Sequence, residues 1–410
     1  MYLCYKRNTL NSDLLMMHEK LLLTPEEKLI LLTADIQPEV AVLNQMDDLI
    51  PHVSHWETFA KMAIDRAAAP LFVEKLPQLN HAGQIPETVL YKLKQASLQT
   101  LSRNMLLTEH FRRIILTLSD AGIPVIALKG SMLSDWLYGN INLRQFSDLD
   151  LLVPPEKGQE AVSCLKRIGY QSNYPVLSNF ISTTDMVHFQ PMVKNGVSVE
   201  IHICLHSKAE DYHVNLPEMW RQAVKLQLHG VDVMGLCPED LLLHLCIHLD
   251  KHFSIGQFQF TCMYDLVNML NHKRDVLNWD LLEQKCILAK AESATYKYLL
   301  LTQKYMNGKL PNFVTEKYGR MLTAKDERIF LRVLRGKGSS YSSARILKKI
   351  NNLSNYKERI QYLFELFYPN TAFMMTRYRL KRKSQLLLYY PYRHFSAMKY
   401  LWMDFKKALI

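Results

Sequence analysis

The sequence predicts an α+β fold in which a small mixed β-sheet is embedded between helical regions at both ends of the chain. Strand-like and helix-like segments alternate through the middle of the chain, a hairpin signal follows them, and helical spacing of apolar residues dominates on either side. The 410 residues suffice for two or three domains, and 48% hydrophobic residues can build sizeable cores. We therefore divide the chain into an N-terminal helical region (1–120), a sheet-containing domain (121–235), a helical domain (236–340) and a basic helical region (341–410).

The N-terminal region has two clear helix signals. Thr24-Pro25-Glu26-Glu27 combines a capping residue with proline in the first turn, which is typical of a helix start. Apolar residues at helical spacing over 87–120 predict one or two long helices that end near Ala121-Gly122. We see no chemically active group in this region and expect it to pack against the sheet domain.

Two carboxylates lie on one short apolar strand, predicted over 147–153. Because side chains alternate along a strand, Asp148 and Asp150 share one face, with their backbones roughly 6–7 Å apart. Two such charges repel each other unless a cation lies between them, and Mg²⁺ prefers oxygen ligands. The pattern predicts a metal site, and removing either carboxylate should then relieve repulsion in the metal-free protein. The alternative is an edge strand with both aspartates in water.

A second signal precedes these acids. A short apolar run, 123–128, leads directly into Lys129-Gly130-Ser131, after which apolar residues recur at helical spacing. This predicts a strand, a tight turn and a helix with Ser131 as its N-cap. A helix N-terminus binds anions through its free N–H groups and its dipole, and Lys129 adds a positive charge. The alternative is an ordinary strand-to-helix turn.

The third acid follows a predicted hairpin. Lys194-Asn195-Gly196 separates two β-rich runs, and Asn-Gly is the strongest short hairpin signal. On the second strand, Glu200 and His202 share the face opposite the apolar side chains. An acid in the middle of a strong strand is costly unless it is paired or bound to a metal, so Glu200 is a further candidate ligand.

Together these segments resemble the polymerase-beta-like nucleotidyltransferase superfamily. The residues that carry the resemblance are LKGS, then RQFSDLDLLV, then VEIH, within roughly 100–270. More closely, the chain looks like a family of largely uncharacterised bacterial nucleotidyltransferases in which Lys-Gly replaces the usual Gly-Gly and an arginine, here Arg144, precedes the acidic strand. The sequence departs from many relatives in having Glu200 where they have aspartate.

The resemblance implies a nucleotidyltransferase that moves a nucleoside monophosphate from an NTP to an acceptor hydroxyl and releases pyrophosphate. Asp148, Asp150 and Glu200 would be catalytic and would hold two Mg²⁺ ions. Lys129, Gly130, Ser131, Arg144 and Ser147 would bind the nucleotide, with Arg144 able to grip the triphosphate bidentately. The acceptor could be a small molecule, a protein side chain or RNA. The alternative is a catalytically inactive nucleotide-binding or scaffold protein that retains the fold.

A predicted helix that begins at Pro238 carries several histidines. His244 and His248 lie four residues apart on one face, which is a possible zinc spacing, although the chain has no H-E-x-x-H arrangement here. A helix that presents His248 and Lys251 toward the nucleotide, supporting the ligands together with His202, is a second interpretation. A plain polar helix face is the third.

The last 70 residues contain the whole net positive charge. Residues 341–410 have 14 Lys and Arg against three acids, which equals the +11 of the entire chain. Basic residues interleaved with tyrosines could bind a polyanion such as RNA, an anionic membrane surface or an acidic partner, or they could form a solvated helix face. The cysteines are scattered and have no C-x-x-C spacing. We see no signal-peptide pattern and no 18-residue apolar run, and we therefore expect a cytoplasmic protein.

Overall fold

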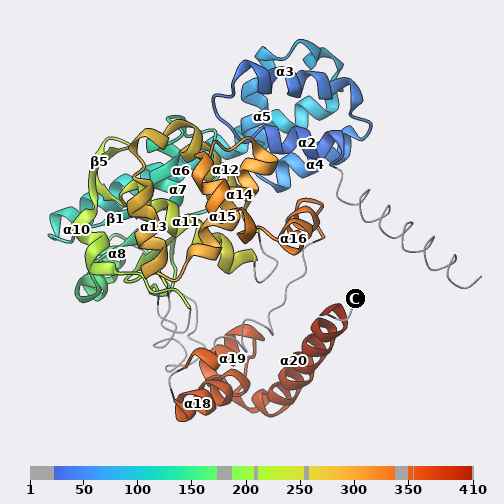
Figure 1. Ribbon diagram of the computed structural model, residues 1–410. Coiled ribbons are helices and arrows are strands. Elements are labelled where there is room, and N and C mark those ends of the chain that lie inside the picture. The colour runs from blue at the N-terminus through green and yellow to red at the C-terminus, as the bar shows by residue number, and fades with distance from the viewer. Residues whose placement is uncertain are drawn as a thin grey trace, which may run out of the picture.

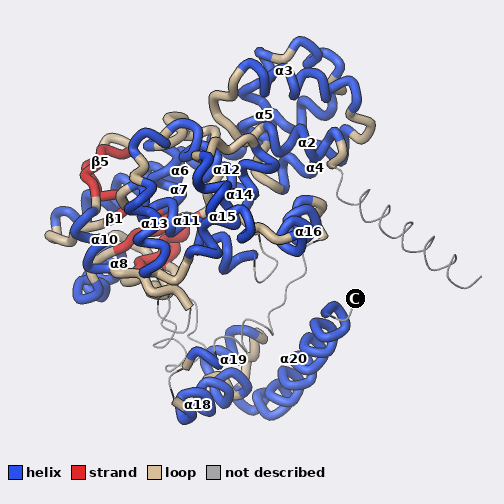
Figure 2. Tube along the Cα trace, in the orientation of Figure 1, coloured by secondary structure: helices blue, strands red, loops and turns tan. Residues whose placement is uncertain are grey.

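The predicted α+β class is confirmed by a computed structural model, in which helices surround one six-stranded mixed sheet (Figures 1 and 2). The structure describes residues 23–172, 187–206, 211–253, 258–337, 350–353 and 355–408. The start of the N-terminal region and residues 341–349 of the basic tail lie outside this part. None of the described helices combines the length and apolar character needed to cross a bilayer.

Short helices form the N-terminal region. They are α2 (Pro25–Leu32), α3 (Val40–Leu49), η1 (Ile50–His52), α4 (Trp56–Asp65), α5 (Ala69–Lys75), η2 (Leu76–Gln78) and η3 (Asn80–Gln84). The predicted start of α2 is confirmed in detail, because the Thr24 hydroxyl accepts from the Glu27 N–H and the Glu27 carboxylate accepts from the Thr24 N–H.

One long helix joins this region to the sheet. The segment expected to form one or two helices is a single helix, α6 (Glu87–Asp120), of 34 residues. It packs against α4 and α5 as well as against α8 and the sheet strand β6. It ends at Ala121, and Gly122 follows with a φ of +66°, a conformation that favours glycine.

The sheet has the strand order β3-β4-β2-β1-β6-β5. Its strands are β1 (Ile126–Leu128), β2 (Asp148–Leu152), β3 (Met192–Lys194), β4 (Val197–His202), β5 (Val224–Leu228) and β6 (Val231–Gly235). β2 runs parallel to β4 and β1 runs parallel to β6, whereas the β1–β2, β3–β4 and β5–β6 pairs are antiparallel. The acidic strand β2 therefore lies inside the sheet, and the edge-strand alternative is wrong.

Two tight hairpins shape the sheet. The predicted turn is confirmed at Asn195-Gly196, where both residues have positive φ (+49° and +74°), as a two-residue type I′ turn requires. His229-Gly230 repeats this pattern between β5 and β6, with φ of +50° and +78°. The sequence analysis did not predict β5, although apolar and polar residues alternate along Val224–Leu228.

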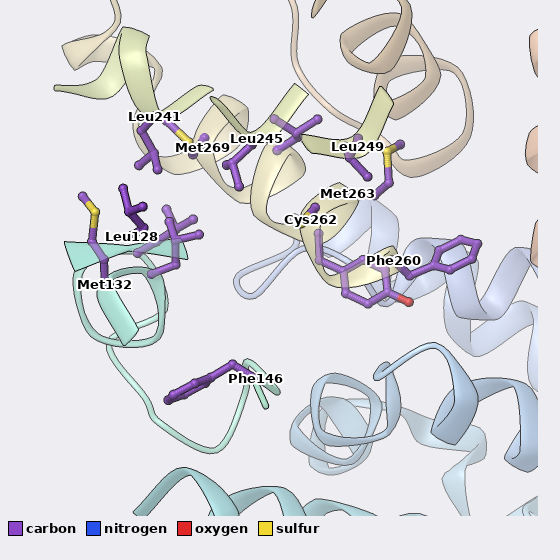
Figure 3. Packing of buried hydrophobic residues seen from close by; sticks show 14 of the residues in the cluster. Leu128, Met132, Phe146, Leu241, Leu245, Leu249, Phe260, Cys262, Met263 and Met269 are labelled. Carbon is purple, nitrogen blue, oxygen red and sulfur yellow. The ribbon is translucent and has the colours of Figure 1, made fainter. Parts of the chain in front are cut away.

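Further helices lie between the strands in the sequence and after the last strand. They are α7 (Lys129–Trp136), η4 (Pro155–Lys157), α8 (Gly158–Arg167), α10 (Leu216–Gln222), α11 (Pro238–Phe253), α12 (Phe260–His272), η5 (Arg274–Val276), α13 (Trp279–Leu288), α14 (Glu292–Met306), α15 (Asn312–Tyr318), η6 (Gly319–Met321) and α16 (Ala324–Leu334). Leu241, Leu245 and Leu249 of α11 lie one helical turn apart, and α12 contributes Met263 and Met269 to the same core (Figure 3).

The last helices lie together, away from the layers around the sheet (Figure 1). They are α18 (Tyr356–Phe367), α19 (Thr371–Arg377), η7 (Lys383–Gln385) and α20 (Leu386–Ala408). α19 and η7 both contact α20.

Candidate active site

A cleft of about 610 Å³ collects most of the residues that the sequence singled out. The sheet contributes Asp148, Asp150, Glu200 and His202, and α7 contributes Lys129 and Gly130. The opposite wall comes from α11, the segment before α12 and the first turn of α12, with His244, His248, Lys251, His252, Phe258 and Cys262. Asp65 and Arg66, at the end of α4, also line the cleft.

The three acids are brought together by the pairing of β2 with β4. In this parallel pair Asp150 lies opposite Glu200, and Asp148 lies opposite Ser198. Since side chains alternate along each strand, all three carboxylates share one face of the sheet. Leu149 and Leu151, which are fully buried, point to the other face.

Asp150 is the most enclosed of the three acids. It is 5% exposed, and its two oxygens have different partners: Lys129 Nζ lies 2.9 Å from Oδ2, and His202 Nε2 donates to Oδ1 at 2.9 Å. Burial raises the pKa of Asp150, but Lys129 and then His202 outweigh burial and hold that pKa well below its usual range. Asp150 is therefore ionised and already neutralised by the protein.

Asp148 has the opposite electrostatic setting. Burial, and next the negative charge of Asp150, raise the pKa of Asp148 above its usual value despite the attraction of Lys129. The Ser147 hydroxyl donates to Asp148 Oδ1 at 3.2 Å, and the Ser147 carbonyl is held by Arg103 at 3.0 Å. Among the described residues, Asp148 has no cationic side chain in salt-bridge contact, in contrast to Asp150.

His202 of β4 connects β4 to β2 through its contact with Asp150. Its Nε2 lies 2.9 Å from Asp150 and 3.5 Å from Oε2 of Glu200, and the ring of His188 approaches the same Glu200 oxygen at 3.5 Å. Burial lowers the pKa of His202, but the hydrogen bonds to Asp150 and Glu200 more than compensate and raise it. Burial raises the pKa of Glu200, whereas His202 and His188 lower it overall.

These side chains can hold a divalent metal. Asp150, Glu200 and His202 each offer a ligand atom, and the three atoms lie within 4.8 Å of one another. Carboxylate oxygens suit Mg²⁺, and an imidazole nitrogen also suits Mn²⁺ or Zn²⁺. The geometry places His202, which we expected only as a supporting residue, beside the acids themselves.

The segment expected to form a turn is built differently. Strand β1 passes directly into α7 at Lys129, which has a φ of +44°, and Leu128 rather than Ser131 is the N-cap residue. Ser131 is the third residue of the helix and is 1% exposed. A Cβ on Gly130 would lie 2.6 Å from Cβ of Phe146, so only glycine allows this close approach. The expected N-cap was wrong, but the helix N-terminus still lies next to the acids.

Arg144 is held by an acid that the sequence analysis missed. Its Nε and Nη2 donate to the two carboxylate oxygens of Asp265 at 2.8 and 2.6 Å, and both residues are buried. The hydroxyl of Tyr138 also donates to Asp265, at 3.0 Å. The expected bidentate grip of Arg144 on a triphosphate is therefore not available in this arrangement, because Asp265 occupies that side of the guanidinium. The signal for Asp265 was an acid inside the apolar run of α12, which needs a buried partner.

Three histidines form a stripe on α11 that faces the cleft. Lys129 Nζ donates to His248 Nε2 at 3.3 Å, and the Nε2 atoms of His248 and His252 lie 3.2 Å apart. Burial, followed by the positive charge of Lys129, holds the pKa values of His244 and His248 well below the usual histidine range. His248 and Lys251 thus line the same cleft as the acids, as the second interpretation of this helix expected.

The zinc interpretation of His244 and His248 gains no geometric support. Among the described residues, the strand group of Asp150, Glu200 and His202 is the one in which three potential ligand atoms converge. The rings of His244 and His248 are 6.1 Å apart between centroids, and within the described part of the chain no third ligand atom converges on one atom from each of these two histidines.

A strand that leads into a helix N-terminus, two acids on the neighbouring strand and a third acid in register with them thus lie together in one cleft. The chain belongs to a family described as uncharacterised nucleotidyltransferase, whose model matches residues 52–307. It is therefore a transferase of nucleotidyl groups. No curated protein matches the chain. Among solved structures, the antibiotic-resistance factor ANT(2'')-Ia is similar, with a TM-score of 0.33 and 12% identity over 49% of this chain and 98% of its own.

Proposed function

We propose that this protein transfers a nucleoside monophosphate from an NTP to an acceptor hydroxyl, with release of pyrophosphate and dependence on Mg²⁺. The observation that carries the proposal is the register of Asp150 opposite Glu200, with Asp148 on the same face and the N-terminus of α7 beside them. Carboxylates gathered next to a helix N-terminus suit a metal-bound polyphosphate.

Asp148, Asp150 and Glu200 would hold the metal, for which we propose two ions. When bound, such ions stabilise the attacking and the leaving oxygens of an in-line displacement. Two of these acids, Asp150 and Glu200, offer ligand atoms that lie within 4.8 Å of each other, and Asp148 shares their face of the sheet. We assign His202 to hold the carboxylates of Asp150 and Glu200 in position, since its Nε2 contacts both.

The nucleotide would lie along the first turn of α7. Lys129, Gly130 and Ser131 would contact the phosphates, and the absence of a Cβ at Gly130 lets the backbone come close. Ser147 would contact the nucleotide from the other side of Asp148. Arg144 would act through Nη1, the guanidinium nitrogen that lies nearest Gly130, while Asp265 holds the rest of the group.

In the transfer step, the acceptor oxygen forms a bond to the α-phosphorus. The bond between the α-phosphorus and the oxygen that bridges it to the β-phosphorus breaks. Pyrophosphate leaves with that electron pair. Glu200 would take the acceptor proton, because its lowered pKa keeps it ionised and therefore able to accept.

The test is to incubate the full chain with each NTP labelled at the α-phosphate, Mg²⁺ or Mn²⁺, and cell extract separated into small molecules, proteins and RNA. We expect metal-dependent label in one fraction and an equal amount of pyrophosphate, both lost in Asp148→Asn. NTP binding without label transfer under any of these conditions would overturn the proposal and favour the inactive nucleotide-binding alternative.

A further inference from the structure

The C-terminal helix α20 turns its apolar face outward. Positions 387, 391, 395, 398 and 402 follow one another at helical spacing and are all exposed, and positions 388 and 392 extend the same face. Leu387 is 81% exposed, Leu388 74% and Phe395 71%. Large aliphatic and aromatic side chains thus form a continuous exposed stripe from Leu387 to Trp402.

Other positions of α20 hold the helix against the C-terminal end of α18 and the residues after it, and one of them, His394, lies directly beside the exposed stripe. The hydroxyl of Tyr390 donates to the carbonyl of Pro369 at 2.5 Å, Arg393 Nη2 donates to the carbonyl of Leu366 at 3.1 Å, and His394 Nε2 lies 3.0 Å from the carbonyl of Phe367. The inward side also carries apolar groups, because Leu386 is half-buried and the ring centroid of Tyr389 lies 5.3 Å from that of Tyr378. α20 is therefore apolar on more than one side, and the side from Leu387 to Trp402 is left exposed.

α18 repeats this arrangement beside it. Tyr356, Ile360, Phe364 and Phe367 lie on one face of the helix, and their exposed fractions are 76%, 51%, 62% and 37%. Exposed apolar patches of this kind on otherwise polar surfaces mark interaction sites. Each of the two helices therefore offers an apolar face to a partner.

The positive charge of the segment before α20 indicates what kind of partner would bind. Arg377, Arg379, Lys381, Arg382 and Lys383 are all exposed in the segment that leads into α20. They belong to the stretch that holds the whole +11 of the chain. A partner with an apolar interior and a negatively charged surface complements both features at once.

We propose that α18, α19 and α20 form a docking surface for an anionic lipid bilayer. α20 would lie in the plane of the interface with Leu387, Phe395 and Trp402 in the acyl region, about 5–10 Å deep. The basic segment before it would meet the phosphate headgroups, where each Lys or Arg strengthens binding by about fivefold. This role is separate from the chemistry of the cleft.

Two other partners fit less well. RNA would use the basic and tyrosine side chains, but it gives no reason for Leu387, Leu388 and Met398 to be exposed. A second copy of the chain would cover the apolar stripe, but it would bring two strongly basic segments together. The bilayer alone accounts for both the apolar stripe and the charge.

The first experiment measures binding of the full chain to vesicles of phosphatidylcholine and to vesicles of phosphatidylcholine and phosphatidylglycerol in equal parts. We expect binding to the anionic vesicles, weakening with salt. Changing Leu387, Phe395 and Trp402 to Asn, or Arg379, Lys381, Arg382 and Lys383 to Gln, should each reduce this binding at least about tenfold.

Matched controls change the same kinds of exposed side chains elsewhere. Leu98, Leu116 and Leu288 to Asn control for lost apolar surface, and Lys28, Lys94, Lys166 and Arg320 to Gln control for lost charge. These variants should bind anionic vesicles as the wild type does. In the wild type, a lipid-borne quencher in the acyl region should reduce tryptophan fluorescence, and Trp402→Phe should abolish most of that quenching.

Three results would overturn the proposal. Wild-type protein that binds neither kind of vesicle would exclude a membrane surface. Salt-dependent binding to RNA that the basic variant loses and the apolar variant keeps, without vesicle binding, would identify a nucleic-acid surface instead. A dimer in sedimentation that the apolar variant dissociates, with vesicle binding absent, would identify a second copy as the partner.

Discussion

The Nζ atom of Lys129 lies 2.9 Å from Oδ2 of Asp150, so the lysine expected on the triphosphate is held by an acid that we propose as a metal ligand. The β1–β2 pairing explains this contact, because Leu128 is the antiparallel partner of Asp150 and Lys129 is the next residue. Lys129 therefore neutralises Asp150 in the metal-free protein. The sequence analysis expected the same effect from removing either aspartate of β2. Because Lys129 neutralises Asp150, the two aspartates instead contribute differently to the stability of the metal-free protein.

Asp148→Asn and Asp150→Asn should change stability in opposite directions. Asp148 has a raised pKa, so its charged form is unfavourable in the fold and Asn should stabilise the metal-free protein. Asp150 has a lowered pKa, and its loss leaves Lys129 buried without its anion, which typically costs about 3–5 kcal/mol. This corrects the expectation that removing either acid relieves repulsion. Urea unfolding without metal measures both, and nucleotidyl transfer should be lost in both. Equal stability changes would contradict the assignment.

Glu200→Gln should reduce turnover by about 10²-fold or more, the usual effect of removing one group that accepts a proton or stabilises charge. NTP affinity should fall less, because Lys129 and the start of α7 are expected to hold the phosphates. Single-turnover rates and equilibrium NTP binding separate the two effects. Unchanged turnover would give Glu200 a structural role only. Glu218→Gln is the control, because Glu218 lies on α10 away from the cleft and pairs there with Arg221.

Three histidines in and beside the cleft should make the protein less stable in mild acid. The pKa values of His206, His244 and His248 are held well below their ordinary value of 6.5, first by burial. Below pH 6.5 the unfolded chain therefore binds more protons than the fold, and the stability present above that pH is lost as the pH falls. Each histidine contributes up to about 1.4 kcal/mol per pH unit in this window.

The measurement is the free energy of unfolding in urea between about pH 5 and pH 8. Below pH 6.5, the free energy of unfolding of His244→Gln should fall less steeply with decreasing pH than that of the wild type. The difference should correspond to one proton fewer taken up on unfolding. If the free energy of unfolding of the wild type does not fall below pH 6.5, these histidines become protonated in the folded protein and the prediction is wrong.

The pair of Arg144 and Asp265 should be essential to the shape of the cleft. Asp265→Asn leaves a buried guanidinium without its carboxylate, which should cost about 3–5 kcal/mol of stability and weaken NTP binding. The double variant Arg144→Met/Asp265→Asn removes both charges and should recover much of the stability while NTP binding stays weak. Thermal unfolding and NTP titration of the three proteins test this. If the double variant binds NTP as the wild type does, Arg144 has no part in nucleotide binding.

Local sequence patterns predicted much of the site. Alternation placed Asp148 and Asp150 on one strand face and Glu200 and His202 on another, since the period of two is a property of any extended chain. Asn195-Gly196 fixed the β3–β4 hairpin because both positions require positive φ. β5 was missed, and the N-cap of α7 was misplaced, because a serine near a helix start is a weak signal when strand and helix meet without a turn.

The sequence by itself determined which residue types lie on which face of each element and where the charge accumulates, because these follow from local periodicity and composition. Only the tertiary structure decided which elements meet. The parallel register of β2 and β4 sets Asp150 opposite Glu200, and the packing of α12 gives Arg144 the partner Asp265. The orientation of α20 likewise leaves its apolar face outward. Such choices depend on burial and pairing between segments far apart in the chain, where contacts compete across the whole core and no local pattern encodes the outcome.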